Sequence, residues 1–438
     1  MKFKFSIVFF LILFQSIFAQ NYTPIDTADE NSRKELVNKY NPVFENFNSI
    51  LKNQYTGKQR NQMLNIFIEI QEDFVEEIEQ GYFTFDEQFQ KMADGILNEL
   101  KSKNPEISDE LKILVSKHGT VNGYCMADGT LVINMGTFKF LENEDQIAGI
   151  VAHEIAHKTL NHVTKSVQRH VSSNISETNQ GKINSIKKKK IGKNEEAFQL
   201  MRSMMYEEGS LRRKQEIEAD SLGYMYFSKT KYDKYQFVEA FKLLQRYDTL
   251  KPAGVEVNTY KKYFDFPAQQ FKEDWMKMED FSAYDYEKYV EKINKDSISS
   301  HPEVIERIDF MERKNPELQT YSESITANSN FLELQYIAEM EEVPNLYFLK
   351  QYGLAIYFSL YYLQQGKDEG FYKYWLGKSF EKIHEARRVY KVNRYLDTVS
   401  PKDQSESYMQ FLNFMWNLNL NEIKNIADFY SQSQAVNS

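Results

Sequence analysis

The sequence predicts a mostly helical α+β fold with a small β-sheet, on three observations. Apolar residues recur at spacings of three and four over residues 41–103 and over 145–167, which is typical of amphipathic helices. Three short apolar segments separated by turn residues lie between these two stretches, which favours strands. Helical patterns resume near residue 195 and again from residue 321 to the end.

The composition is that of a folded, packed chain. Of 438 residues, 42% are hydrophobic and 27% are charged, and there are only 17 Gly and 9 Pro, which excludes a disordered or low-complexity chain. The formal net charge of −9 gives no general electrostatic footprint for nucleic acid, so we expect no nucleic-acid partner. Cys125 is the one cysteine, which rules out an intramolecular disulfide, and we expect it to pack in the core.

Residues 1–19 have the pattern of a secretory signal peptide. Lys2 and Lys4 precede an apolar run over residues 5–14, and Ala19 stands before polar sequence. The apolar run is about half of the roughly 20 residues that a membrane span needs. We therefore expect an exported chain, periplasmic or secreted, without a transmembrane span in its mature part. An uncleaved anchor is the alternative.

The remaining chain divides into an N-terminal helical region over residues 20–109 and two further regions. In the N-terminal region Gly81 marks a break between helices. The last region, 316–438, is predicted to be helical and is a candidate interaction module. Its apolar stretch over 347–363 is too short and too interrupted for a membrane span, so we predict one buried helix there.

The central region, 110–315, holds the predicted strands and the residues with chemical potential. Strands are expected over 111–115, 121–126 and 130–134, and a helix begins after Asn143. The polar residues 172–194, which include four consecutive lysines, are expected to form an exposed loop.

The motif His153-Glu154-Ile155-Ala156-His157 points to a metal centre. Two residues four apart on a helix differ by a net rotation of about 40°, so both imidazoles point to one side and can bind one metal ion. Glu154 follows the first histidine and is placed to take a proton from water at that metal.

Catalytic zinc usually takes three protein ligands, so a third must come from elsewhere. Glu216 and Asp220 are four apart on a predicted helix, and one of them can bind metal while the other orients a ligand imidazole. Glu218 is expected to point away. His162 lies five residues after His157, about 140° around a helix, so we expect it to pack or form hydrogen bonds rather than share the metal.

These residues resemble the CAAX prenyl-protease and HtpX-like zinc metallopeptidases of peptidase family M48. The resemblance covers about residues 110–315 and rests on the run 122–157, on Glu216 with Asp220, and on a later His301-Pro302 followed by Arg307-Ile308. It implies a zincin-type domain with one zinc ion held by His153, His157 and Glu216. It also implies that Glu154 is the general base and that Asp220 has a supporting role.

The resemblance further implies that His301 and Arg307, six positions apart, reach the cleft. They are candidate donors to the oxyanion, and His301 is alternatively a latch that closes on the metal as a fourth ligand. The chain lacks the multiple transmembrane helices of these proteins and so resembles the soluble periplasmic branch. Asn122-Gly123 replaces a common Asn-Ala pair, and leaves a backbone that can run along a substrate as an edge strand.

The expected function is that of an exported zinc-dependent metalloendopeptidase which hydrolyses peptide bonds in protein or peptide substrates, in envelope protein quality control. The alternative is a chaperone-like or adaptor protein that binds envelope proteins through its helical regions, with cleavage rare or latched. Both hypotheses allow a peripheral association with envelope proteins.

Overall fold

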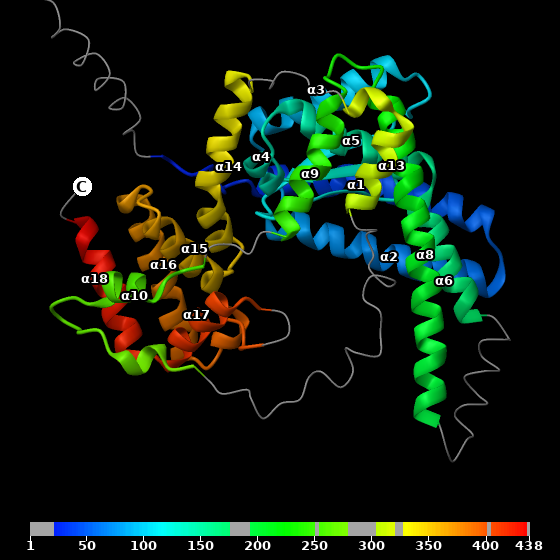
Figure 1. Cartoon of the computed structure of the whole chain (residues 1–438). Coiled ribbons are helices and arrows are strands. Elements are labelled where there is room, and N and C mark those ends of the chain that lie inside the picture. Colours follow the sequence, from blue (N-terminus) through cyan, green and yellow to red (C-terminus); the bar gives the residue numbers. More distant parts are fainter. Residues whose placement is uncertain are drawn as a thin grey trace, which may run out of the picture. The chain divides into compact units, whose positions relative to one another are not determined.

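The computed structural model describes residues 22–175, 193–249, 254–278, 304–319, 327–400 and 404–435 (Figure 1). The chain forms two compact units. The larger unit comprises Thr27–Pro252 and Asp280–Asn345, and the smaller one Met1–Asp26, Ala253–Glu279 and Leu346–Ser438. Helices dominate and one small sheet is present, which confirms the mostly helical α+β class.

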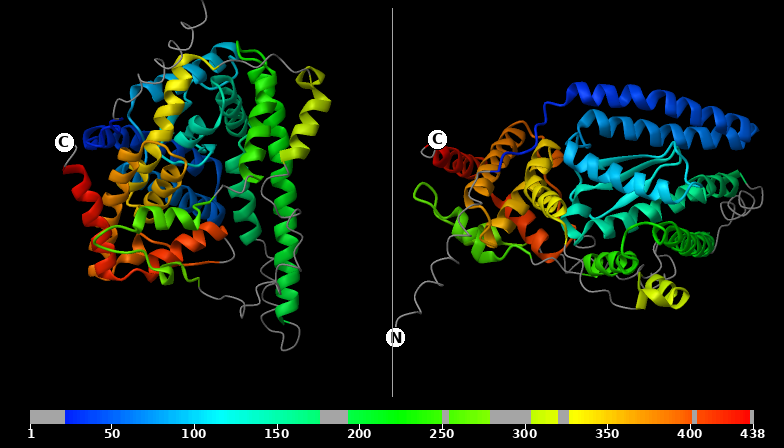
Figure 2. Two further views of the ribbon diagram at one scale, coloured as in Figure 1. Left: turned by 60° about the vertical axis from the view of Figure 1, so that its left-hand side comes forward. Right: turned by 90° about the horizontal axis from the view of Figure 1, so that it is seen from above.

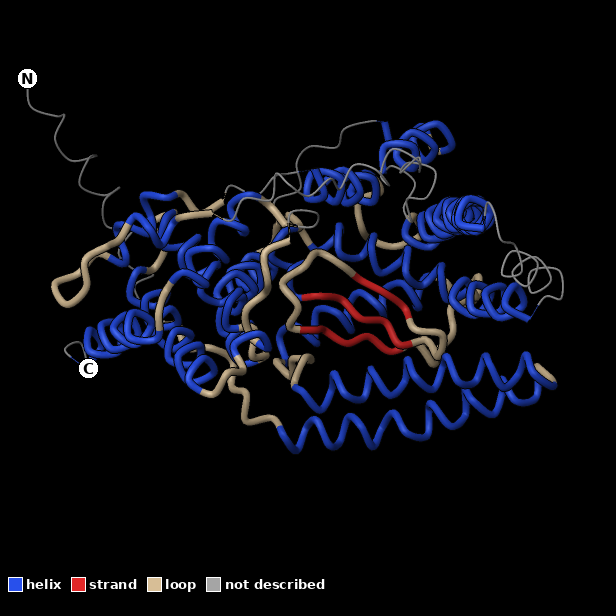
Figure 3. Tube along the Cα trace, turned by 90° about the horizontal axis from the view of Figure 1, so that it is seen from below, coloured by secondary structure: helices blue, strands red, loops and turns tan. Residues whose placement is uncertain are grey.

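The sheet of the larger unit has three strands in the order β1-β3-β2 (Figure 3). Strand β3 is central, parallel to β1 and antiparallel to β2. All five residues of β3 are buried because helices cover both faces of the sheet. Strand β2 is an edge strand and is shorter than the predicted segment 121–126. The strands are β1 (Lys112–Ser116), β2 (Gly123–Cys125) and β3 (Thr130–Asn134).

A helical hairpin of α1 (Glu30–Gln54) and α2 (Gly57–Gln80) packs against one face of this sheet (Figure 2). Tyr40, Phe44 and Phe74 form an aromatic cluster that contacts the strands in one hydrophobic core. Helix α2 ends at Gly81, whose φ of 83° is a left-handed conformation that suits glycine. The predicted break at Gly81 is therefore confirmed.

Helices α3, α5, α8 and α9 pack together on the side of the larger unit that carries His153 and His157. Asp86 caps α3 by accepting hydrogen bonds from the backbone N–H groups of Gln88 and Phe89, and Asn143 caps α5 in the same way through Gln146. The described helices of this unit after α2 are α3 (Glu87–Lys103), α4 (Met135–Phe140), α5 (Glu144–Thr159), α6 (His162–Ile175), α8 (Lys193–Phe227), α9 (Tyr235–Thr249), α13 (Val304–Lys314) and most of α14 (Ser329–Phe348).

The smaller unit combines the C-terminal helices with residues 254–278, which fall within the predicted central region 110–315. Tyr430 donates a hydrogen bond to the Tyr263 carbonyl at 2.6 Å, and the Tyr263 hydroxyl donates to the Leu363 carbonyl at 3.1 Å. Its elements are α10 (Val257–Phe264), α15 (Tyr352–Gln364), α16 (Glu369–Arg388), α17 (Glu406–Asn417), α18 (Leu420–Ala435) and two 3₁₀ turns (Glu273–Met276 and Val392–Arg394).

One predicted helix is wrong. Residues 347–363 were expected to form a single buried helix, but α14 ends at Phe348 and α15 begins at Tyr352. Lys350 lies between them with a φ of 62°, which an α-helix does not allow. Within the described ranges, no helix is long and apolar enough to cross a membrane. The predicted loop over 172–194 lies mostly outside the described residues, and its first four residues belong to α6.

Candidate metal centre

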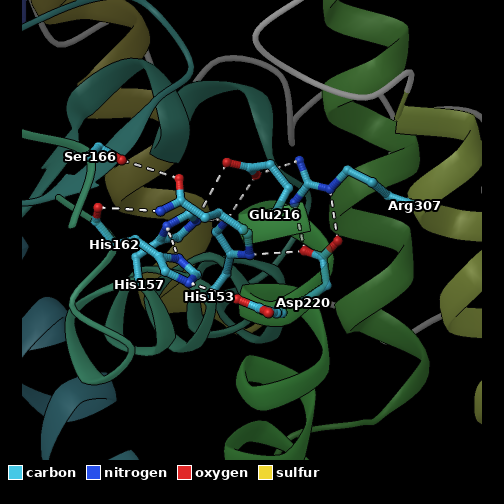
Figure 4. A network of polar contacts seen from close by, with 9 residues as sticks. His153, His157, His162, Ser166, Glu216, Asp220 and Arg307 are labelled. Atoms are coloured by element: carbon cyan, nitrogen blue, oxygen red, sulfur yellow. Dashed lines mark hydrogen bonds and ion pairs between the residues drawn. The ribbon is translucent and has the colours of Figure 1, made fainter. Parts of the chain in front are cut away.

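Helix α5 carries the two histidines of the motif into the interior of the larger unit. Its buried residues Ile147 and Val151 anchor the helix. The two histidines share another side of it, about 120° around the helix from that pair. The Nε2 atoms of His153 and His157 face each other at 3.0 Å (Figure 4). His153 is buried and His157 is partly exposed, so the pair is open on one side.

Helix α8 adds a carboxylate to this pair. Glu216 Oε2 lies 3.5 Å from His153 Nε2, and Glu216 Oε1 lies 3.6 Å from His157 Nε2. Ligand atoms on a tetrahedral zinc ion are about 3.3–3.6 Å apart, given metal–ligand bonds of about 2.0–2.2 Å. The two distances from Glu216 to the histidines lie in this range, and the 3.0 Å between the two Nε2 atoms needs to lengthen by only a few tenths of an ångström to admit a zinc ion.

Gly223 allows α8 to come this close to α5. A Cβ atom at this position would lie 2.9 Å from the Cα atom and 3.0 Å from the backbone nitrogen of His153. Glu216 is seven residues, or about two turns, before Gly223 on the same helix, so this contact sets its distance from the histidines. Gly223 was not among the predicted site residues, although a glycine inside a predicted helix was a usable signal.

Asp220 and Arg307 contact the candidate ligands. Asp220 Oδ1 lies 2.9 Å from His153 Nδ1, the ring nitrogen that faces away from the centre. Arg307 donates to both Asp220 oxygens at 2.8 and 2.6 Å, and its Nη1 lies 3.1 Å from Glu216 Oε2 (Figure 4). The guanidinium also lies over the Phe241 ring, 4.7 Å from its centroid.

Arg307 is thus buried among the two carboxylates. These contacts give it a positioning role for Asp220 and Glu216, whereas its role as an oxyanion donor stays a prediction. His301, the other candidate donor or latch, lies outside the described residues.

Burial and charge separate the pKa values of the two histidines. Burial alone would lower the pKa of His153, but its contacts with Asp220 and Glu216 raise it to about 9. Burial, together with the nearby charge of His153, lowers the pKa of His157 to about 3. Without a metal ion, a proton on His153 therefore adds to the charge of Arg307 in balancing the carboxylates. A metal ion can take the place of that proton.

Glu154 lies between the ligands and the edge strand. Burial and the charge of Glu216 raise its pKa to about 7, against the opposing effect of His153. The nearby backbone N–H of Cys125, the last residue of β2, also opposes this rise in the pKa of Glu154. Cys125 itself is buried, in agreement with the expected packing role.

Two residues outside the predicted ligand set also contact the centre. His162 Nδ1 lies 3.0 Å from His157 Nδ1, and His162 Nε2 lies 3.3 Å from Glu218 Oε2. The expected hydrogen-bonding role of His162 is what the structure shows. Glu218 lies outside the ligand set, as expected. Its contact with His162 was not predicted.

Comparison with known proteins yields one result. Residues 86–315, slightly more than half of the chain, match the model of Peptidase family M48. None of the curated proteins matches the sequence.

Proposed function

We propose, from the premise that this chain belongs to peptidase family M48, that it is a zinc-dependent endopeptidase which hydrolyses peptide bonds within protein substrates. Membership of the family makes it a metallopeptidase. The choice of zinc, the cleavage within chains and the cellular location are the proposed parts.

The cluster of His153, His157 and Glu216 carries this proposal. Among the residues that the structure describes, it is the one group of three or more metal-binding side chains whose ligand atoms all lie within 4.8 Å of one another. Two imidazoles and one carboxylate form a donor set typical of catalytic zinc. A zinc ion held there supplies a Lewis acid that polarises a carbonyl and lowers the pKa of water toward about 7.

Glu154 is the residue of this chain that moves the proton. Its carboxylate takes a proton from water and passes it to the nitrogen of the departing amine. Its pKa of about 7 suits both steps near neutral pH, since the group has to be an effective base and then an effective acid.

The edge strand β2 provides a surface for the substrate backbone. In the described sheet it pairs with β3 alone, and the backbone N–H of its last residue, Cys125, lies near enough to Glu154 to lower the pKa of that carboxyl group. An extended segment that pairs with such an edge is bound through its main chain on both sides of one peptide bond. This supports cleavage within a chain rather than at its ends.

Metal removal tests the proposal. We expect one zinc ion per chain in the purified protein, and cleavage of a quenched fluorescent peptide with both termini blocked. A chelator should abolish this cleavage and added zinc should restore it, because no other group in the centre supplies a Lewis acid. Cleavage that persists in metal-free protein, or cleavage only of peptides with a free end, contradicts the proposal.

We also propose that the protein is exported from the cytoplasm. The support is the sequence of residues 1–19, with its lysines, apolar run and Ala19. Fractionation of the source cells with N-terminal sequencing should find the protein outside the cytoplasm and beginning near Gln20. Recovery of the protein in the cytoplasmic fraction, with its first residues intact, contradicts export.

A further inference from the structure

The turn between α5 and α6 brings a third histidine against the motif. Helix α5 ends at Thr159, and Asn161 follows with a φ of 57°, a left-handed conformation that asparagine tolerates better than most residues. On an unbroken helix His162 would lie about 140° away from His157. The turn folds it back instead, so that the two Nδ1 atoms are 3.0 Å apart (Figure 4).

The contacts assign a role to each nitrogen of the two rings. His157 Nε2 faces His153 and Glu216, so as a metal ligand it must present a lone pair there. The ring proton of His157 then sits on Nδ1 and is donated to His162 Nδ1. The proton of His162 therefore sits on Nε2, from which it is donated to Glu218 Oε2 at 3.3 Å.

We propose that His162 and Glu218 are positioning residues for His157, as Asp220 is for His153. This inference rests on the proposed zinc function. The hydrogen-bond chain from His157 through His162 to Glu218 fixes both the tautomer and the orientation of the His157 ring, and so presents Nε2 to zinc.

The surroundings of His162 make it a rigid support. The residue is 3% exposed, and Gln215 Nε2 donates to its backbone carbonyl at 3.4 Å. Gln215 in turn accepts a hydrogen bond from Ser166 on α6. One stretch of α8, residues 215–220, therefore supplies the ligand Glu216 and the groups that orient both histidines.

Zinc affinity of the full-length protein tests this inference. His162→Phe keeps a ring in the space but removes the acceptor for His157 Nδ1–H, and should weaken zinc binding by about 10–100-fold. His162→Asn places an oxygen near the position of Nδ1 and should recover most of that loss. Titration against a competing chelator measures the affinities, and melting of the metal-free variants shows whether each one is folded.

A second readout follows the proton itself. In the zinc-loaded protein labelled with ¹⁵N-histidine, long-range ¹H–¹⁵N spectra should show His157 protonated on Nδ1 and His162 on Nε2. His162→Asn should retain the His157 Nδ1–H signal in its shifted, hydrogen-bonded position, and His162→Phe should lose that shift. A role in packing alone would not reproduce this pattern.

Two variants of exposed residues on α8 complete the test. Glu218→Ala should weaken zinc binding in the same direction as His162→Phe. Lys214→Ala is the matched control, because Lys214 is exposed, lies 3.8 Å from Glu218 and is not in the chain of hydrogen bonds from His157 through His162 to Glu218. If His162→Phe does not fold, Glu218→Ala decides the question.

The two proposals fail in different ways. Unchanged zinc affinity in His162→Phe and Glu218→Ala, beside a wild-type protein that binds zinc, overturns the positioning role alone. A wild-type protein that binds no zinc overturns both.

Discussion

Replacement of Glu154 by glutamine is expected to reduce peptide cleavage by at least about 10²–10⁴-fold while zinc binding is retained. The amide has nearly the same size as the carboxylate, so it should fit the same buried position. It cannot take a proton from water or deliver one to the leaving nitrogen. Cleavage of the blocked peptide and zinc content, measured on the same preparation, check both parts of this prediction.

Glu142→Gln is the control for this experiment. Glu142 is exposed and precedes α5, so the same chemical change there should leave cleavage and zinc content as in the wild type. Full cleavage by Glu154→Gln would remove Glu154 from the mechanism. The variant also addresses the adaptor alternative, because a protein that acts by binding alone should retain its whole effect on client proteins.

Gly223→Ala is expected to destabilise the protein and to weaken zinc binding together. The new Cβ atom would lie within 3.1 Å of three backbone atoms of α5, including the Cα of His153. Backbone cannot give way as a flexible side chain can, so α8 has to move. We expect a loss of about 1–3 kcal/mol in the free energy of unfolding, as for other overpacked cores. Because Glu216 and Asp220 are on α8, the zinc affinity should fall as well.

Gly95→Ala in α3 is the matched control for Gly223→Ala. Gly95 also lies inside a helix, but no atom lies within 4 Å of the position of its missing Cβ. Alanine there should raise the free energy of unfolding by about 0.5–1 kcal/mol, since it favours the helix over the unfolded chain. Denaturant unfolding and zinc titration of both variants provide the comparison. A stabilising effect at both positions would show that α5 and α8 are not in close contact at Gly223.

The sequence was most informative where structure depends on neighbours along the chain. The motif around His153, the helix after Asn143 and the three strands follow from spacing and turn residues alone. The ligand Glu216 required the family resemblance, because the choice between it and Asp220 depends on which side chain a distant helix faces.

Features that depend on tertiary contacts could not be predicted from spacing and turn residues. The turn at Asn161 brings His157 and His162 together, although an unbroken helix would place them about 140° apart. A single left-handed residue leaves no signal in the periodicity of the sequence. The same is true at Lys350, where an apolar pattern continues across the end of one helix and the start of the next. Residues 254–278 pack with helices 100 to 167 residues further along the chain, and such pairing leaves no local pattern.

The contact of Arg307 with Asp220 and Glu216 has a consequence for biosynthesis. The ribosome completes both ligand helices before it reaches α13, so a nascent chain contains His153, His157 and Glu216 but lacks the cation that balances the carboxylates. Two buried carboxylates without that partner are strongly disfavoured. The two carboxylates therefore gain this partner only after α13 has been made and packs on α8, and we expect the centre to reach its final arrangement at that step.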